Sequence, residues 1–211
     1  MSRLTENLEV ISERIRLDLA AQDAAREKAM PLSREVIRLA SHTIRAVHRH
    51  EYDAARNSLA EARRMLSDAK KALNSCIELP NTHFVWDAEK EYSEASVTLS
   101  LVLGEKIPAP DEIEVDNAAY LNGMAEGASE LRRYLLDSLR KGDYSRGEEL
   151  LEDMDDIYNV LVTMDFPDSI TGGLRRTTDA LRGVLEKTRS DLTLSAQQKR
   201  LEDKLSRLNP A

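Results

Sequence analysis

Residues that break helices are rare in this chain, and this constrains its fold more than any other feature. Six Pro and eight Gly are spread over 211 residues, and no stretch of strand length alternates apolar and polar side chains. Strict alternation is typical of a half-buried strand, whereas Pro and Gly mark where helices end. The sequence therefore predicts an all-α protein, an elongated antiparallel bundle of about six or seven helices.

The few breakers also predict where the helices begin and end. The first helix is expected over 4–50, with Pro31 either kinking it or separating two helices. Further helices are expected over 53–75, from 81 or 82 to 103, over 117–141 and 146–164, and from 174 to 191 or beyond, with turns at 79–82 and 167–173 and a loop at 106–116. Residues 1–194 are expected to form one domain, and 195–211 a short C-terminal helix or a flexible tail.

Composition bears on the location of the protein more than on its chemistry. The single Cys76 excludes an internal disulfide and suits a reducing compartment. No apolar run approaches the roughly 20 residues of a membrane span, so a cytoplasmic protein without a membrane segment is expected. The net charge of −8 argues only weakly against nucleic-acid binding, because phosphate contacts depend on where the Lys and Arg residues lie.

A row of arginines follows the helix expected over 4–50. Arg34, Arg38, Arg45 and Arg49 share an arc of about 80° on a helix, and His42 fills the gap between them. A continuous row of guanidinium groups is what a phosphate backbone needs. The alternative is a solvated face, or a face that forms ion pairs with a neighbouring helix.

A second basic row is expected near the C-terminus. Arg175, Arg182 and Arg189 recur every seven residues, with Arg176 beside them. Two such rows in one chain favour a groove or lumen lined with positive charge, which Arg175, Arg176 and Arg182 would help to form. Glu186, four residues after Arg182, is a local partner that weakens this interpretation.

Acidic residues are spaced at helical intervals in two separate helices. Glu91 and Glu94, together with Asp87, share an arc of about 60°, whereas the ordinary polar face of their helix is expected to run through Glu89, Ser93 and Ser96. Unpaired charges in partly apolar surroundings are costly, so these acids need a cation.

Glu126 and Glu130 lie about 40° apart on the helix expected over 117–141. They form either part of a site or a solvated edge. Carboxylates from two helices that meet across a bundle would make an oxygen-only site, which suits Mg²⁺ or Mn²⁺. Such a site could activate water and neutralise charge on a phosphodiester. The four His residues have no metal-ligand spacing.

Several short motifs, taken in order, resemble the family of translin and translin-associated factor X. They are Glu91-Tyr92-Ser93-Glu94-Ala95, then Tyr120-Leu121-Asn122-Gly123 followed by Ser129-Glu130-Leu131, and Gly142-Asp143-Tyr144-Ser145-Arg146. The resemblance extends over about 22–191. It implies a helical protomer that assembles into a closed octameric barrel with single-stranded RNA, or single-stranded DNA, inside.

The two branches of that family differ at the acids. Translin lacks the Glu-x-x-Glu pair and binds nucleic acid, whereas factor X carries it, has a second acidic pair spaced by four, and cleaves RNA. This chain resembles the catalytic branch, although Glu126 stands where the family usually has Asp. The resemblance therefore implies an Mg²⁺-dependent endoribonuclease that uses Glu91, Glu94, Glu126 and Glu130 for catalysis and metal binding. The alternatives are a catalytically silent nucleic-acid-binding oligomer, and a helical scaffold whose charged stripes are only solvated faces.

Overall fold

The computed structural model describes residues 3–74 and 83–208, and every regular element in these two ranges is a helix. The elements are α1 (Arg3–His48), α2 (Tyr52–Asn74), α3 (His83–Leu103), α4 (Pro110–Ile113), α5 (Asn117–Arg140), α6 (Gly147–Leu161), α7 (Asp168–Thr171) and α8 (Leu174–Leu208). The prediction of an all-α fold is confirmed for the described part of the chain. The predicted turn at 79–82 and Cys76 lie outside the described residues.

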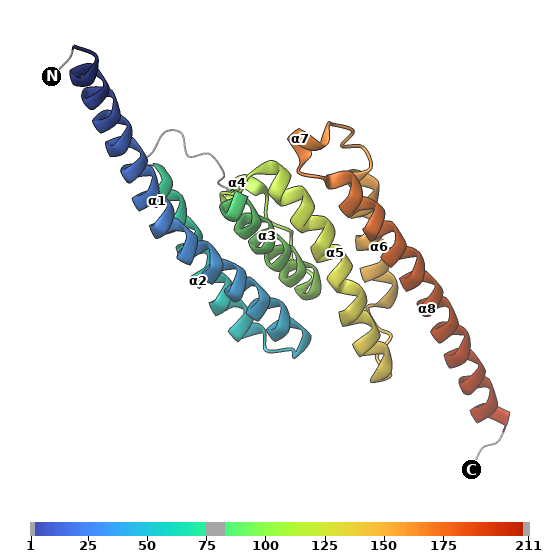
Figure 1. Ribbon diagram of the computed structural model, residues 1–211. Helices are drawn as coiled ribbons and strands as arrows, with labels where there is room; N and C mark the ends of the chain where they lie inside the picture. The colour runs from blue at the N-terminus through green and yellow to red at the C-terminus, as the bar shows by residue number, and fades with distance from the viewer. Residues whose placement is uncertain (1–2, 75–82, 209–211) are drawn as a thin grey trace.

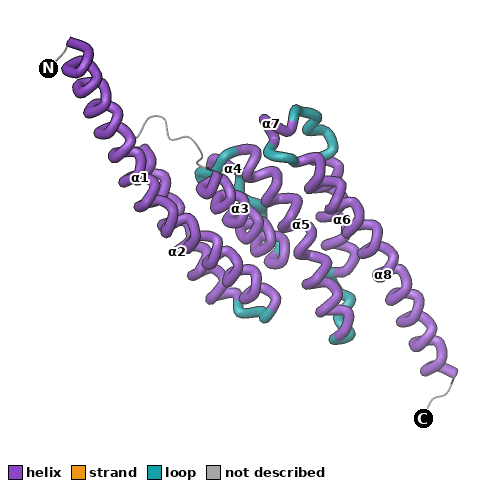
Figure 2. Tube along the Cα trace, in the orientation of Figure 1, coloured by secondary structure: helices purple, strands orange, loops and turns teal. Residues whose placement is uncertain are grey.

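The long helices form layers that lie side by side, with α3 in the middle (Figure 1). On one side α3 packs against the hairpin of α1 and α2, and on the other side it packs against α5. The far side of α5 is covered by α6 and α8. Figure 2 shows that, within the described residues, loops and turns join α1 to α2, α3 to α5 and α5 to α6. Because α3 is covered from two sides, it supplies much of the core, including the buried residues Val97, Leu99 and Val102.

The first helix passes through Pro31 as one continuous element. The sequence had left open a kink or two separate helices, and the second of these is wrong. An interior proline removes one backbone hydrogen bond and costs about 3 kcal/mol in an isolated helix. Here the turns that follow Pro31 are docked firmly, because Val36, Leu39 and Ala40 are buried. Their packing keeps the helix intact.

The other helix ends agree closely with those predicted. Asp116 caps α5 by accepting hydrogen bonds from the backbone N–H groups of Ala118 and Ala119. The predicted loop at 106–116 contains the short helix α4, and the predicted turn at 167–173 contains α7. Residues 195–208 continue α8 without a break.

Both α1 and α8 extend past the body of the bundle at opposite corners (Figure 1). Their projecting ends carry large apolar side chains that are exposed in the protomer, among them Leu8 and Ile15 on α1 and Leu201 and Leu205 on α8. Within the described residues, no helix is both long enough and apolar enough to cross a membrane.

Candidate metal centre

Two glycines of α5 let it approach α3 until the two backbones touch. A Cβ atom at Gly123 would lie 2.4 Å from the carbonyl oxygen of Lys90 and 2.9 Å from the backbone nitrogen of Glu94. One turn later, a Cβ atom at Gly127 would lie 3.0 Å from the carbonyl oxygen of Glu94. Any larger residue at these positions would push the helices apart. The glycines therefore bring Glu126, which stands between them in the sequence, close to the acids of α3.

The face of α3 that was predicted to be its polar, solvated side is in fact buried. Ser93 and Ser96 donate hydrogen bonds to the carbonyl oxygens of Glu89 and Tyr92, four residues earlier, and Glu89 is ion-paired with Lys70 of α2. This prediction was wrong because a hydroxyl that bonds its own helix is small and satisfied, so it can pack like an apolar group. The face of α3 with Glu91 and Glu94 keeps partial access to solvent.

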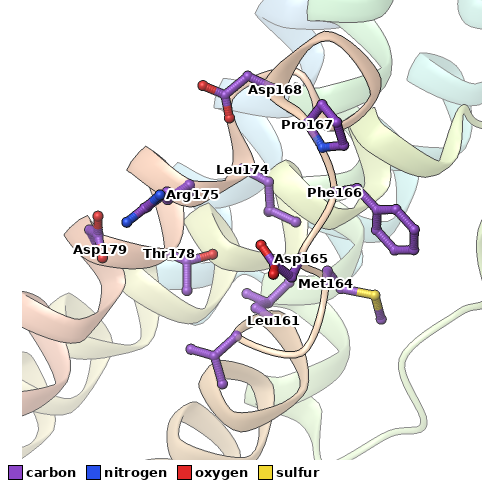
Figure 3. A pocket seen from close by; sticks show the side chains of 11 residues that line it. Leu161, Met164, Asp165, Phe166, Pro167, Asp168, Leu174, Arg175, Thr178 and Asp179 are labelled. Carbon is purple, nitrogen blue, oxygen red and sulfur yellow. The ribbon is translucent and has the colours of Figure 1, made fainter.

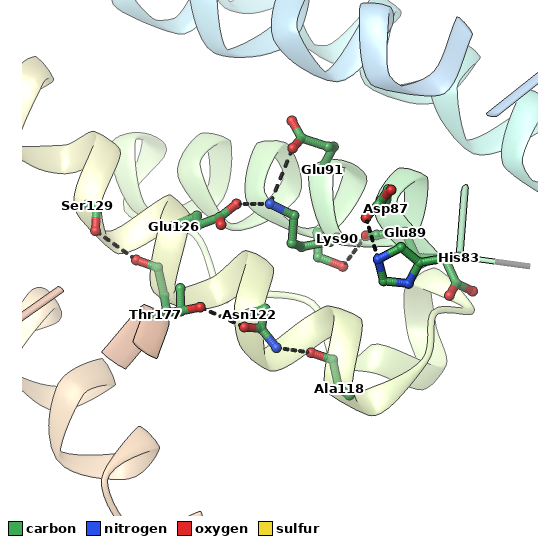
Figure 4. Close-up of polar contacts among 12 residues, drawn as sticks. His83, Asp87, Glu89, Lys90, Glu91, Ala118, Asn122, Glu126, Ser129 and Thr177 are labelled. Atoms are coloured by element: carbon green, nitrogen blue, oxygen red, sulfur yellow. Dashed lines mark hydrogen bonds and ion pairs between the residues drawn. The ribbon is translucent and has the colours of Figure 1, made fainter. Parts of the chain in front are cut away.

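Three carboxylates converge where α3 and α5 touch. Glu91, Glu94 and Glu126 each offer one oxygen, and these three oxygens all lie within 4.8 Å of one another. No other set of three acidic, His or Cys side chains converges so closely within residues 3–74 and 83–208. Asp87 stays outside the cluster, and its carboxylate lies 3.6 Å from His83 Nε2 (Figure 4).

Glu94 is the carboxylate most strongly affected by this arrangement. Burial raises the pKa of its carboxyl group, and the nearby charges of Glu91, Glu126 and Glu130 raise it further, to about 8. The positive charge of Lys90 acts in the opposite direction but does not offset the increase. The cluster therefore holds more negative charge than its own cation neutralises, which favours binding of a further cation.

Lys90 lies inside the cluster, between carboxylates of the two helices. Its Nζ is 2.5 Å from Glu126 Oε2 and 3.4 Å from Glu91 Oε1 (Figure 4). Burial alone would lower the pKa of Lys90, but the ion pairs with Glu126 and Glu91 outweigh it and raise the pKa. Sequence reasoning missed Lys90, although its position four residues before Glu94 was a signal that it shares the acidic face.

Glu130 lies one turn beyond Glu126 and is bound by the last residue of α1. His48 Nε2 is 2.7 Å from Glu130 Oε2, and the side chain of His48 is only 4% exposed. This hydrogen bond lowers the pKa of Glu130 despite the opposing effect of burial. His48 Nδ1 is buried and has no hydrogen-bond partner in the described structure. The sequence gave no local signal for this contact, because His48 and Glu130 meet only through tertiary packing.

The first arginine row is exposed along α1. Arg38 forms an ion pair with Glu35 at 2.5 Å, whereas no carboxylate in the described ranges lies within ion-pair distance of Arg34, Arg45 or Arg49. Arg45 lies about 60° around the helix from His48 and one turn before it. Because His48 contacts Glu130, the row approaches the edge of the acidic site.

The second arginine row lies in a different layer of the bundle. Its helix α8 packs on α5, α6 and α7. Arg176 is exposed, and Arg182 forms an ion pair with Glu186 at 3.1 Å. Arg175 lines a pocket of about 660 Å³ at the start of α8, where Figure 3 shows it near Asp179. A lumen lined by both rows therefore stays a prediction.

One curated protein and three solved structures illustrate what this chain is similar to. No family model matches the chain. A search of curated proteins found an uncharacterized protein of Methanocaldococcus jannaschii that is 30% identical over 193 residues, which cover 90% of this chain and 85% of that protein.

Solved structures match this chain over more than 90% of its length. The structure of AfC3PO in complex with duplex RNA is 33% identical to this chain, with a TM-score of 0.79, and the match covers 93% of this chain and 98% of that one. A crystal structure of AfC3PO is 32% identical over the same shares of both chains, with a TM-score of 0.77. Apo-NeC3PO, at 19% identity, covers 92% of this chain and 98% of its own, and its TM-score of 0.75 shows the fold alone. The fold is thus that of the C3PO-like helical proteins. The chain belongs to the translin family.

Proposed function

We propose that this protein is a metal-dependent endoribonuclease that binds and cleaves single-stranded RNA. The observation that carries the proposal is the convergence of Glu91, Glu94 and Glu126 within 4.8 Å on two helices in backbone contact. The similarity to AfC3PO, which has been solved with duplex RNA, supports RNA as the ligand.

The donor set of the cluster fits Mg²⁺ or Mn²⁺. Mg²⁺ prefers oxygen ligands, and all three converging groups are carboxylates without a His or Cys among them, which disfavours Zn²⁺. The pKa of about 8 at Glu94 supports the same conclusion, because a divalent cation would offset the mutual repulsion that raises it. Glu91, Glu94 and Glu126 would hold the ion, and Glu130 would join them from the next turn of α5. When bound, the ion would act as a Lewis acid and neutralise charge on the scissile phosphodiester.

The protein's own residues would bind and orient the RNA around this centre. Arg34, Arg45 and Arg49 are exposed and free of ion-pair partners in the described structure, so they would contact successive phosphates. Arg38 would exchange Glu35 for a phosphate, and Arg175, Arg176 and Arg182 would contribute from other parts of an assembly. His48 would keep the Glu130 carboxylate in one orientation through its hydrogen bond.

We also propose that the protein forms a homo-oligomer, with the octamer of the family resemblance as the expected size. Leu4, Leu8, Ile11 and Ile15 follow each other at heptad spacing on the projecting end of α1, and all are 45–66% exposed. Monomeric proteins rarely expose a contiguous row of large apolar side chains to water. Light scattering after gel filtration should give the mass of an oligomer, and Leu8→Glu/Ile15→Glu should reduce it. Val10→Glu is the matched control, because Val10 is 70% exposed but lies on another face of α1.

Cleavage of a labelled single-stranded RNA, in Mg²⁺ or in EDTA, tests the nuclease proposal. We expect cleavage to require Mg²⁺ and to be lost in Glu91→Gln/Glu94→Gln, while RNA binding is kept or strengthened because two acidic side chains are removed from the site. The matched control is Glu148→Gln/Glu152→Gln, which replaces the same number of carboxyl groups on an exposed face of α6 and should cleave normally. Cleavage that persists in EDTA or in the first variant would contradict the proposal.

The second candidate is a catalytically silent oligomer that binds single-stranded RNA or DNA. The ion pair of Lys90 with Glu126 favours it, because a cation of the protein already occupies the cluster. In this case we expect salt-sensitive binding without cleavage, and Arg45→Ala should reduce the slope of log affinity against log salt by about 0.7. Arg16→Ala, at an exposed arginine paired with Glu13, should leave the slope unchanged. RNA affinity no better than that of an unrelated acidic protein, without steep salt dependence, would instead support a helical scaffold.

A further inference from the structure

The ammonium group of Lys90 takes the place where a metal ion would be expected. Its Nζ contacts Glu126 Oε2 at 2.5 Å and Glu91 Oε1 at 3.4 Å, so it joins α5 to α3 across the cluster (Figure 4). The Lys90 side chain is 18% exposed. This is the lowest exposure among the lysine side chains that form ion pairs within the described residues.

A divalent ion and this ammonium cannot use the same oxygens at once. Mg²⁺ binds carboxylate oxygens at about 2.0–2.1 Å, so an ion on Glu126 Oε2 would lie within a few ångströms of Nζ. Two cations at that separation repel strongly in a partly buried site. The lysine stem is flexible and reaches solvent at one side, so the ammonium can leave the cluster while its backbone stays in place.

We propose that Lys90 is a tethered counter-cation that competes with the divalent metal for Glu126 and thereby sets the metal affinity of the site. The proposal rests on the metal site proposed above. Without metal, Lys90 would offset the repulsion among Glu91, Glu94 and Glu126. With metal, it would give up Glu126 and move towards solvent. The energy needed to break this ion pair is subtracted from the binding of every metal ion, so the site would load only at high metal concentration.

Direct metal binding tests the proposal without any measurement of cleavage. We would titrate the full-length, RNA-free protein with Mn²⁺ and follow the free ion by electron paramagnetic resonance. Removing the competing charge in Lys90→Met should lower the Mn²⁺ dissociation constant by at least about tenfold. Lys90→Arg keeps the charge and should stay near the wild-type value. Lys71→Met, at an exposed lysine paired with Asp68, is the matched control and should leave the constant unchanged.

Thermal unfolding gives a second measurement on the same variants. In EDTA, Lys90→Met should melt below the wild type, because the acids lose their counter-cation, and Mn²⁺ should raise its melting temperature by more than it raises the wild type's. If Lys90→Met does not fold, Lys90→Gln keeps a polar end group and replaces it in both experiments.

The outcomes separate this inference from the proposed function. Equal Mn²⁺ affinity in the wild type and in Lys90→Met would overturn the competition but leave the metal site intact. Weaker binding in Lys90→Met would also overturn it, since Lys90 would then assist the metal. If neither protein binds Mn²⁺ at millimolar concentration, both the metal site and the competition are wrong.

Discussion

The contact of Gly123 with α3 leads to a quantitative prediction about Gly123→Ala. The new methyl group would lie 2.4 Å from the carbonyl oxygen of Lys90, 2.7 Å from Ser93 Cβ and 2.9 Å from the backbone nitrogen of Glu94. Two of these three atoms belong to the backbone, so no side-chain rotation can make room for the methyl group. We expect α5 to move away from α3, and Glu126 to move with it.

The size of the effect follows from two opposing contributions. Overpacking a tight interface costs about 1–3 kcal/mol, and the backbone contacts place this substitution at the upper end. Replacing an interior helix glycine by alanine returns about 1 kcal/mol of helix stability. The net loss is therefore about 2 kcal/mol, which corresponds to a decrease in melting temperature of about 4–8 °C for a chain of this size.

Gly183→Ala is the matched control. Gly183 lies inside α8, and nothing lies within 4 Å of its added Cβ. This variant should gain about 1 kcal/mol and melt about 2–4 °C above the wild type. Both variants would be heated at the same protein concentration in EDTA, and their Mn²⁺ affinities compared. If Gly123→Ala is as stable as Gly183→Ala and binds Mn²⁺ as tightly as the wild type, the backbone contact does not position the acids.

Two further predictions concern charge in the site. The pKa of about 8 at Glu94 means that the folded protein keeps a proton that the unfolded chain releases near pH 4.5, so the free energy of unfolding should fall as pH rises between these values. Between pH 5 and 8 in EDTA, the melting temperature of the wild type should fall, and that of Glu94→Gln should fall less. An equal fall with pH in both proteins would refute the raised pKa of Glu94. His48→Ala should cost about 1–3 kcal/mol in urea unfolding at pH 7, because it leaves the half-buried Glu130 carboxylate without its partner. The exposed His83 provides a control that should change little, and an equal loss in His83→Ala would contradict a specific role for His48.

The sequence predicted the helices well because their signals are local. Asp116 at the start of α5 and Gly142 after its end could be found from the residues around them. Glu91, Glu94 and Glu126 could be proposed as one site only because helical spacing and the family resemblance agreed. The contact of His48 with Glu130 depends on packing between residues 82 positions apart, and no local pattern encodes it. The burial of Glu89 was missed for a related reason, since its partner Lys70 comes from α2.

The position of Lys90 also has a consequence for how the protein is made in the cell. Small metal-dependent domains often stay unfolded until their ion arrives, because nothing else neutralises the ligands. Here the three acids and their ammonium all come from the continuous segment 90–126, so the counter-charge is synthesised together with the ligands. We expect the newly made chain to fold without waiting for metal, and a chelator to leave it folded. Under the proposed function, the supply of ions would then control cleavage, whereas folding would not depend on it.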